Sequence, residues 1–170
     1  MCIRDRQEIF GEAFSYQTIR QRRKDLMSKH IAEHGIEKKP GVDELLDYLH
    51  QKGIKTAVAT ATDEVRAKDY LTQIGIYEKF DRIICATMVA HGKPKPDIYR
   101  YACKQIGEKP EDCIAVEDSP NGVRSASTAG LRTIMVPDLT EPDEETAQRL
   151  FTTAHSLDEI IRLFEEKQIF

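Results

Sequence analysis

Two acidic residues, Glu117 and Asp118, stand side by side in the stretch VEDSPNG, directly after the apolar run 113–116. Adjacent carboxylates at the end of a strand repel each other and lose hydration, and a bound cation offsets that cost. Mg²⁺ is a hard ion that takes oxygen ligands, and one or two carboxylates suffice when other oxygens complete its shell. The pair therefore indicates a Mg²⁺ site, and a solvated acid pair in a loop is the alternative.

Two further segments could bind an anion. Thr60 follows an apolar run, and a helix is expected to begin two or three residues later, so its hydroxyl would lie beside the free N–H groups of a helix start. The alternative for Thr60 is an ordinary helix cap. Lys93 lies in GKPKPD, where two prolines stiffen the backbone that presents the ammonium group. Lys95 is the rival in the same segment, and the sequence does not separate the two lysines.

The elements that carry these residues alternate regularly beyond Gly53. Short apolar runs predict strands, and the amphipathic stretches between them predict helices. The expected strands are 54–60, 80–86, 112–117 and 131–136, and the expected helices are 63–74, 96–106, 120–129 and 157–167. Such alternation, with strands apolar on both faces, is typical of a parallel sheet covered by helices. Ligands bind at the carboxyl ends of the strands in such a sheet, which is where these polar residues fall.

Two helices are expected before the first strand. Apolar residues recur at three- and four-residue steps from Gln7 to about Glu33, and Gly35 ends this segment. A second helix is expected from about Gly41 to Gln51. The first 50 residues contain no convincing strand. The N-terminal part is therefore expected to be helical, whereas strands and helices alternate in the rest of the chain.

The turn after the acid pair is suited to starting a helix. Ser119 is a good N-cap, Pro120 fits the first helical position, and Gly122 permits close packing. We therefore expect the acid pair to stay at the edge of the sheet while the chain turns into the helix 120–129.

Three motifs together resemble the haloacid dehalogenase superfamily: TAT after an apolar strand, then GKPKPDIY, then VEDSPNGVRSASTAG, in this order. The resemblance is to subfamily IA, the phosphatase and β-phosphoglucomutase-like branch that carries a helical cap. It covers about residues 37–137 strongly and 7–36 more loosely. It implies an α/β fold, with a Rossmann-like parallel sheet flanked by helices in residues 41–170 and the remnant of a helical cap in residues 1–40.

The resemblance also implies a chemistry. In this family an aspartate attacks the phosphoryl group to form an aspartyl-phosphate, and Mg²⁺ screens the charge. Lys93 would stabilise charge on the nucleophile and on the transferring phosphoryl group. The implied residues are Thr60, Ala61, Thr62, Lys93 and the cap residue Arg23 for the phosphoryl group and substrate, and Glu117 and Asp118 for Mg²⁺.

One feature of the family is missing. Its nucleophile and general acid lie in an apolar strand followed by D-x-D-G, before the cap, and this sequence contains no D-x-D. Asp5 lacks both the preceding strand and a second acid two residues later, and the opening MCIRDR differs from a cap helix. We therefore expect an N-terminally truncated fragment that is inactive alone. In the family the missing strand lies between those ending at Thr60 and Glu117, so their inner edges would be unpaired and the chain prone to association.

These features predict a Mg²⁺-dependent phosphatase or phosphomutase that acts on a small phosphorylated metabolite, such as a sugar phosphate. A signalling module like a response-regulator receiver domain is one alternative, but there the acid pair comes first in the chain and the lysine last. A natural phosphate-binding protein that has lost its nucleophile is the other alternative.

Composition limits the class of protein further. The chain has 170 residues, of which 40% are apolar and 32% charged, and such values are typical of a soluble globular protein. Its net charge of −4 argues against a nucleic-acid partner, and we interpret RQRRK at 20–24 as a solvated helix face. No apolar run approaches the roughly 20 residues of a membrane span. The cysteines show no C-x-x-C spacing and are expected to be reduced in the cytoplasm: Cys2, Cys85, Cys103 and Cys113.

Overall fold

The computed structural model describes residues 15–167, and the chain divides into two compact units, residues 1–37 and 38–170. The helices are α2 (Tyr16–His34), α3 (Val42–Gln51), α4 (Glu64–Gln73), α5 (Asp97–Ile106), α6 (Pro120–Ala129), α7 (Glu144–Ala147) and α8 (Leu157–Lys167). Short 3-10 helices are η1 (Tyr77–Lys79), η2 (Ala86–Met88) and η3 (Pro110–Asp112). The strands are β1 (Ala57–Thr60), β2 (Arg82–Cys85), β3 (Ile114–Glu117), β4 (Arg132–Met135) and β5 (Thr152–Thr153).

The described part of the first unit is dominated by one helix, α2. The Ser15 side chain caps it by accepting a hydrogen bond from the Thr18 N–H, and Gly35 ends it with a positive φ of 76°. The helix predicted from residue 7 is thus confirmed from residue 16 onward, while residues 7–14, with Cys2 and Asp5, lie outside the described part. Leu26 and Met27 are exposed on α2.

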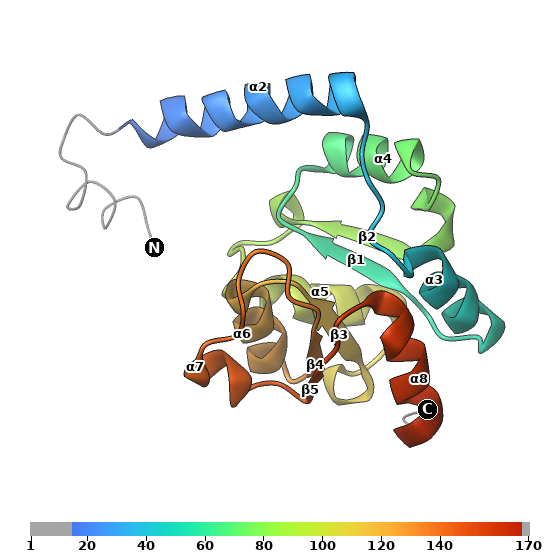
Figure 1. Cartoon of the computed structure of the whole chain (residues 1–170). Helices are drawn as coiled ribbons and strands as arrows, with labels where there is room; N and C mark the ends of the chain where they lie inside the picture. The colour runs from blue at the N-terminus through green and yellow to red at the C-terminus, as the bar shows by residue number, and fades with distance from the viewer. Residues whose placement is uncertain (1–14, 168–170) are drawn as a thin grey trace. The chain divides into compact units, whose positions relative to one another are not determined.

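All strand pairs in the second unit are parallel (Figure 1). β1 pairs with β2, and a second sheet has the order β3-β4-β5. Parallel strands flanked by helices confirm the predicted α/β class. Within residues 15–167, β1 and β3 do not pair with each other, so one edge of each has no strand beside it, as expected.

Helices cover both faces of β3. Alternate residues of a strand point to opposite sides, so neighbouring residues of β3 show which helices pack on each face. Ala115 packs into a cluster with Ala102 of α5 and Ala126 of α6, whereas Ile114 packs against a second cluster formed by α3, β4 and α8. α3 and α8 accordingly lie side by side in Figure 1.

One helix, α5, connects the two sheets. It contacts β1 and β2 as well as α6, and the cluster that contains its Ile98 also includes Ile84 of β2 and Ala115 of β3. The buried apolar side of α5 therefore holds the ends of β1 and β3 at a common edge of the unit.

The observed strands are shorter than predicted because turn hydrogen bonds use the flanking backbone groups. The N–H of Ile54 bonds to the carbonyl of Leu49 at the end of α3, and the N–H of Leu131 bonds to the carbonyl of Ala126 at the end of α6. α6 and α8 have the predicted bounds. α7 and β5 were not predicted, because a four-residue helix and a two-residue strand carry too little periodic signal.

Within residues 15–167, no helix combines the length and the apolarity that crossing a bilayer requires.

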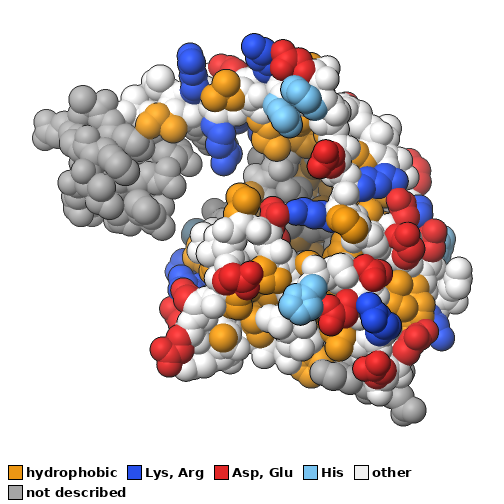
Figure 2. Space-filling model, in the orientation of Figure 1, with side chains coloured by type: hydrophobic (Ala, Val, Ile, Leu, Met, Phe, Trp, Pro, Cys, Tyr) orange, Lys and Arg blue, Asp and Glu red, His pale blue; other side chains and the backbone are white. Residues whose placement is uncertain are grey.

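Acidic side chains gather over α7 on the face shown in Figure 2, where the first turn contains Glu144 and Glu145. Among the described cysteines, Cys85 and Cys103 are buried thiols and Cys113 is half-buried. Burial raises the pKa of Cys113 to about 12, which keeps this thiol protonated at neutral pH.

We predict that the chain self-associates as its concentration rises. Val116 of β3 is 38% exposed, and one edge of this strand has no partner within the described residues. Exposed apolar strand edges pair with other chains, and a lysine opposes such pairing. In sedimentation velocity, Val116→Lys is expected to shift the distribution toward monomer. Val65→Lys is the matched control, because Val65 is 79% exposed on a helix. Equal association of all three proteins would contradict the prediction.

Candidate functional site

Lys93 joins the carboxyl ends of β1 and β3. Its Nζ donates a hydrogen bond of 3.0 Å to the carbonyl of Ala59, next to Thr60. The same ammonium group forms a short hydrogen-bonded ion pair with Oε1 of Glu117. The Lys93 side chain is 17% exposed and that of Glu117 5%. The structure thus brings a lysine and a carboxylate from the predicted set into one largely buried pair.

The geometry separates Lys93 from its rival. Lys95 is exposed, and its carbonyl accepts a 2.6 Å hydrogen bond from the buried hydroxyl of Ser125 on α6. Ser125 therefore anchors the backbone of the proline-containing segment, while Lys93 points toward the acid. Of these two lysines, only Lys93 contacts Glu117 in the described part of the chain.

Glu117 is a buried acid with several compensating interactions. Its carboxylate lies directly over the backbone of Gly122, so closely that a Cβ on that residue would fall 1.8 Å from Oε2. Gly122 is in the first turn of α6, where the helix dipole favours negative charge. The Ser119 hydroxyl caps the same helix, and Pro120 begins it, as predicted. A side chain at this position would displace the carboxylate from the place where it meets Lys93 and Tyr99.

Tyr99 also contacts the pair. It lies in the first turn of α5, its hydroxyl donates a short hydrogen bond to Oε1 of Glu117, and its ring centroid is 5.0 Å from Nζ of Lys93. Burial, and then the charge of Glu117, raise the pKa of Tyr99 far above its usual value. The phenol is therefore protonated and acts as a donor to Glu117.

Thr60 is half-buried at the end of β1, and its hydroxyl accepts a 3.1 Å hydrogen bond from the N–H of Thr62. The helix-cap alternative for Thr60 is wrong, because the cap of α4 is Asp63, whose side chain accepts from the N–H of Arg66. Ala61, between Thr60 and Thr62, is exposed. The segment 60–62 thus places the Thr60 hydroxyl and the backbone N–H of Ala61 at the strand end, and such donors suit an anion.

Asp118 differs from its neighbour Glu117, because it is exposed and its side chain makes no hydrogen bond or salt bridge within residues 15–167. No cluster of three or more His, Cys, Asp or Glu side chains suited to a metal exists in the described part of the chain. Two adjacent carboxylates still fit Mg²⁺, which completes its shell with water and substrate oxygens. Of the two carboxylates, that of Asp118 is the accessible one, because Glu117 is buried and bonds to Lys93 and Tyr99.

Arg23, the predicted cap residue, is exposed on α2 in the first unit. Its role toward the substrate stays a prediction.

Sequence reasoning missed two residues that shape the site, Tyr99 and Ser125. Tyr99 belongs to the recognised motif GKPKPDIY, but its hydroxyl gave no periodic or spacing signal. Ser125 is a fully buried polar residue on α6. A polar residue on the predicted apolar side of a helix was the only available signal, because buried hydroxyls need partners.

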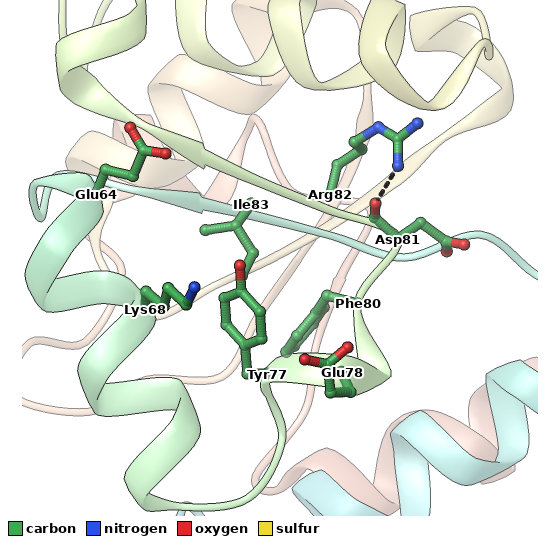
Figure 3. A pocket seen from close by; sticks show the side chains of 8 residues that line it. All are labelled: Glu64, Lys68, Tyr77, Glu78, Phe80, Asp81, Arg82 and Ile83. Carbon is green, nitrogen blue, oxygen red and sulfur yellow. Dashed lines mark hydrogen bonds between the residues drawn. The ribbon is translucent and has the colours of Figure 1, made fainter.

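A separate pocket of about 410 Å³ lies beside α4, η1 and β2 (Figure 3). Tyr77, Phe80 and Ile83 form part of its lining, together with charged groups that include Lys68 and Arg82. None of the candidate site residues lines it. Its residues therefore do not contribute to the cluster at the strand ends.

The family model for haloacid dehalogenase-like hydrolases matches residues 5–130. The chain belongs to this family. A protein CbbY from Cereibacter sphaeroides is 39% identical over 120 residues, which are 69% of this chain and 52% of that protein. A phosphorylated carbohydrates phosphatase from Thermotoga maritima is 33% identical over 106 residues, 62% of this chain and 49% of that protein. The chain thus spans about half the length of these curated relatives.

Similarity to solved structures leads to the same family. The crystal structure of CbbY from Rhodobacter sphaeroides in complex with phosphate superposes with a TM-score of 0.74 at 33% identity, covering 88% of this chain and 68% of that chain. The haloacid dehalogenase-like chain therefore falls in the predicted subfamily IA, among phosphatase and β-phosphoglucomutase-like proteins.

We predict that Lys93→Ala destabilises the chain strongly. Removing one partner of a buried ion pair leaves an uncompensated charge and costs about 3–5 kcal/mol. Lys95→Ala is the matched control and is expected to change the free energy of unfolding by less than about 0.5 kcal/mol, as for most surface substitutions. Urea denaturation followed by circular dichroism measures both values. Similar values for the two variants would show that the Lys93–Glu117 pair does not form.

A second prediction concerns the contact between Gly122 and Glu117. Gly122→Ala is expected to destabilise the chain by about 1–3 kcal/mol through overpacking, although alanine in a helix interior is normally favoured over glycine by about 1 kcal/mol. In a Glu117→Ala background the clash is absent, so the same change is expected to be neutral or stabilising. A double-mutant cycle in urea checks this, and additive effects would contradict the contact.

Proposed function

We propose that this chain carries the phosphoryl-binding part of a Mg²⁺-dependent phosphatase or phosphomutase. The observation that carries the proposal is the position of Lys93, whose ammonium group reaches both the end of β1 and the acid at the end of β3. Family membership supports the reaction class. A parallel sheet collects ligand-binding groups at this same edge.

Each side chain has a definite task in this proposal. The hydroxyl of Thr60 and the N–H groups of Ala61 and Thr62 hold the phosphoryl oxygens. For Thr62, this requires that its N–H release the Thr60 hydroxyl, which it now bonds at 3.1 Å. Lys93 stabilises the negative charge on the phosphoryl group, since a fixed cation in a buried setting interacts strongly with developing charge.

Asp118, together with Glu117, is the proposed holder of Mg²⁺. When bound, the ion would neutralise charge on the phosphoryl group and help to orient it. The chain's own contribution is to keep two carboxylates at the strand end, one exposed and one held by Lys93 and Tyr99.

The chain supplies no D-x-D segment, so we propose that it has no nucleophilic aspartate and is inactive alone. Residues 1–40 are proposed to belong to a helical cap, with Arg23 offering a cation to the substrate, and residues 41–170 to the core. A cap over the strand ends would exclude water and select the substrate.

A sugar phosphate is the proposed substrate class. One similar protein is described as a phosphorylated carbohydrates phosphatase, and a mutant CbbY from Rhodobacter sphaeroides, 34% identical to this chain, has been crystallised in complex with xylulose-(1,5)bisphosphate. We also propose a cytoplasmic setting, because the described cysteines are free and two of them are buried.

The function is tested by phosphate release from a panel of sugar phosphates with Mg²⁺. The 170-residue chain is expected to show none. The reading frame upstream of Met1 is then sequenced, and if it encodes an apolar strand ending in D-x-D-G, the extended protein is expected to be active. In it, Lys93→Ala should lower kcat/KM by roughly 100-fold or more, as for loss of one charge-stabilising donor. Asp118→Asn should require much more Mg²⁺ for half-maximal rate.

Lys95→Ala is the control and is expected to retain activity. Mg²⁺-dependent turnover by the 170-residue chain would refute its proposed inactivity. An extended protein with D-x-D-G but no phosphatase or mutase activity would refute the proposed reaction. A closed upstream frame with retained affinity for inorganic phosphate would favour the phosphate-binding protein without catalysis.

A further inference from the structure

Tyr99 contacts both members of the Lys93–Glu117 pair. Its side chain is buried, with the residue 7% exposed, and its hydroxyl donates to the same Glu117 oxygen that accepts from Lys93. The hydroxyl oxygen also lies 3.5 Å from Nζ of Lys93, and the ring lies beside the ammonium group at 5.0 Å. A lysine ammonium has three N–H donors, and in this arrangement they face Ala59, Glu117 and Tyr99.

We propose that Tyr99 is a positioning residue that fixes the orientation of both Lys93 and Glu117. The role of this orientation in catalysis rests on the proposed function, whereas the positioning itself does not. A phenol hydroxyl has one proton to donate and lone pairs to accept, so it can donate to Glu117 while it faces an N–H of Lys93. Phenylalanine would retain the ring and its attraction for the cation but would lose both hydroxyl contacts.

The three contacts of Lys93 differ in strength. The bonds to Ala59 and Glu117 are within ordinary hydrogen-bond distance or shorter, whereas the 3.5 Å contact to Tyr99 is at the outer limit. The N–H that faces Tyr99 is therefore the one that a phosphoryl oxygen would take over. Tyr99 thus holds this donor in place, near the strand end that carries Thr60, before the anion arrives.

The experiment measures exchange of the Lys93 ammonium protons with water by ¹H–¹⁵N NMR of the full 170-residue chain, at one fixed pH. The wild-type Lys93 signal is expected to exchange several-fold more slowly than that of the exposed Lys95. In Tyr99→Phe the Lys93 rate is expected to rise several-fold. Tyr101→Phe is the matched control: Tyr101 lies on the same helix and packs against the same cluster, but has no hydrogen bond in the described structure. It should leave the Lys93 rate unchanged.

A purely structural role for Tyr99 gives a different result. If Tyr99→Phe lowers the melting temperature but leaves Lys93 exchange unchanged, the proposal is overturned. Should this variant not fold, ¹³C-tyrosine NMR of Glu117→Gln decides, because it keeps Tyr99 intact. The Tyr99 ¹³Cζ resonance should then move more than that of Tyr101, and an equal or smaller shift would overturn the proposal.

Inorganic phosphate then separates this inference from the proposed function. If the wild-type chain binds phosphate, Tyr99→Phe is expected to weaken the affinity several-fold and Tyr101→Phe to leave it unchanged. An unchanged affinity in Tyr99→Phe would remove Tyr99 from anion binding. Failure of the wild-type chain to bind phosphate counts against the proposed function alone, since the exchange measurement needs no ligand.

Discussion

The burial of one carboxylate, that of Glu117, is the constraint on which the organisation of the second unit depends. A carboxylate removed from water is unstable unless a cation, hydrogen-bond donors or a helix dipole replace the lost hydration. The chain provides all three: Lys93 from the loop before α5, the Tyr99 hydroxyl from α5 itself, and the first turn of α6 through Gly122. Each must reach the end of β3, so the positions of this loop and of both helices are coupled.

The same interactions hold the two sheets together at their carboxyl ends. α5 packs across β1, β2 and α6 through apolar contacts, and Lys93 adds a polar connection between the carbonyl of Ala59 and the acid of β3. The buried hydroxyl of Ser125 anchors the backbone between Lys93 and α5 by donating to the carbonyl of Lys95. Lys93, which is proposed to act in phosphoryl transfer, therefore also links the two sheets. Both the stability of the unit and the proposed chemistry require a cation at this point.

Sequence periodicity was sufficient to predict most helices and strands of the second unit. α6 and α8 have the predicted bounds. For α6 the signals are local, because Ser119 and Pro120 mark its start and Gly130 follows its end. The predicted strands were longer than the observed ones, because the composition of an apolar run does not reveal where the hydrogen bonds between paired strands begin and end. At residue 54 the backbone bonds to the end of α3 instead. α7 and β5 were missed, since their formation depends on packing against α6 and pairing with β4.

The sequence by itself determined the α/β class, the family and the strand ends that carry polar groups, because strand–helix alternation and the three motifs are local properties of the chain. Only the tertiary structure showed that Lys93, and not Lys95, pairs with Glu117, and that Asp63 rather than Thr60 caps α4. It also revealed Tyr99, since these outcomes depend on distances between side chains far apart in the sequence. Lys93 and Glu117 are 24 positions apart, and their contact exists because α5 and α6 pack together beneath them.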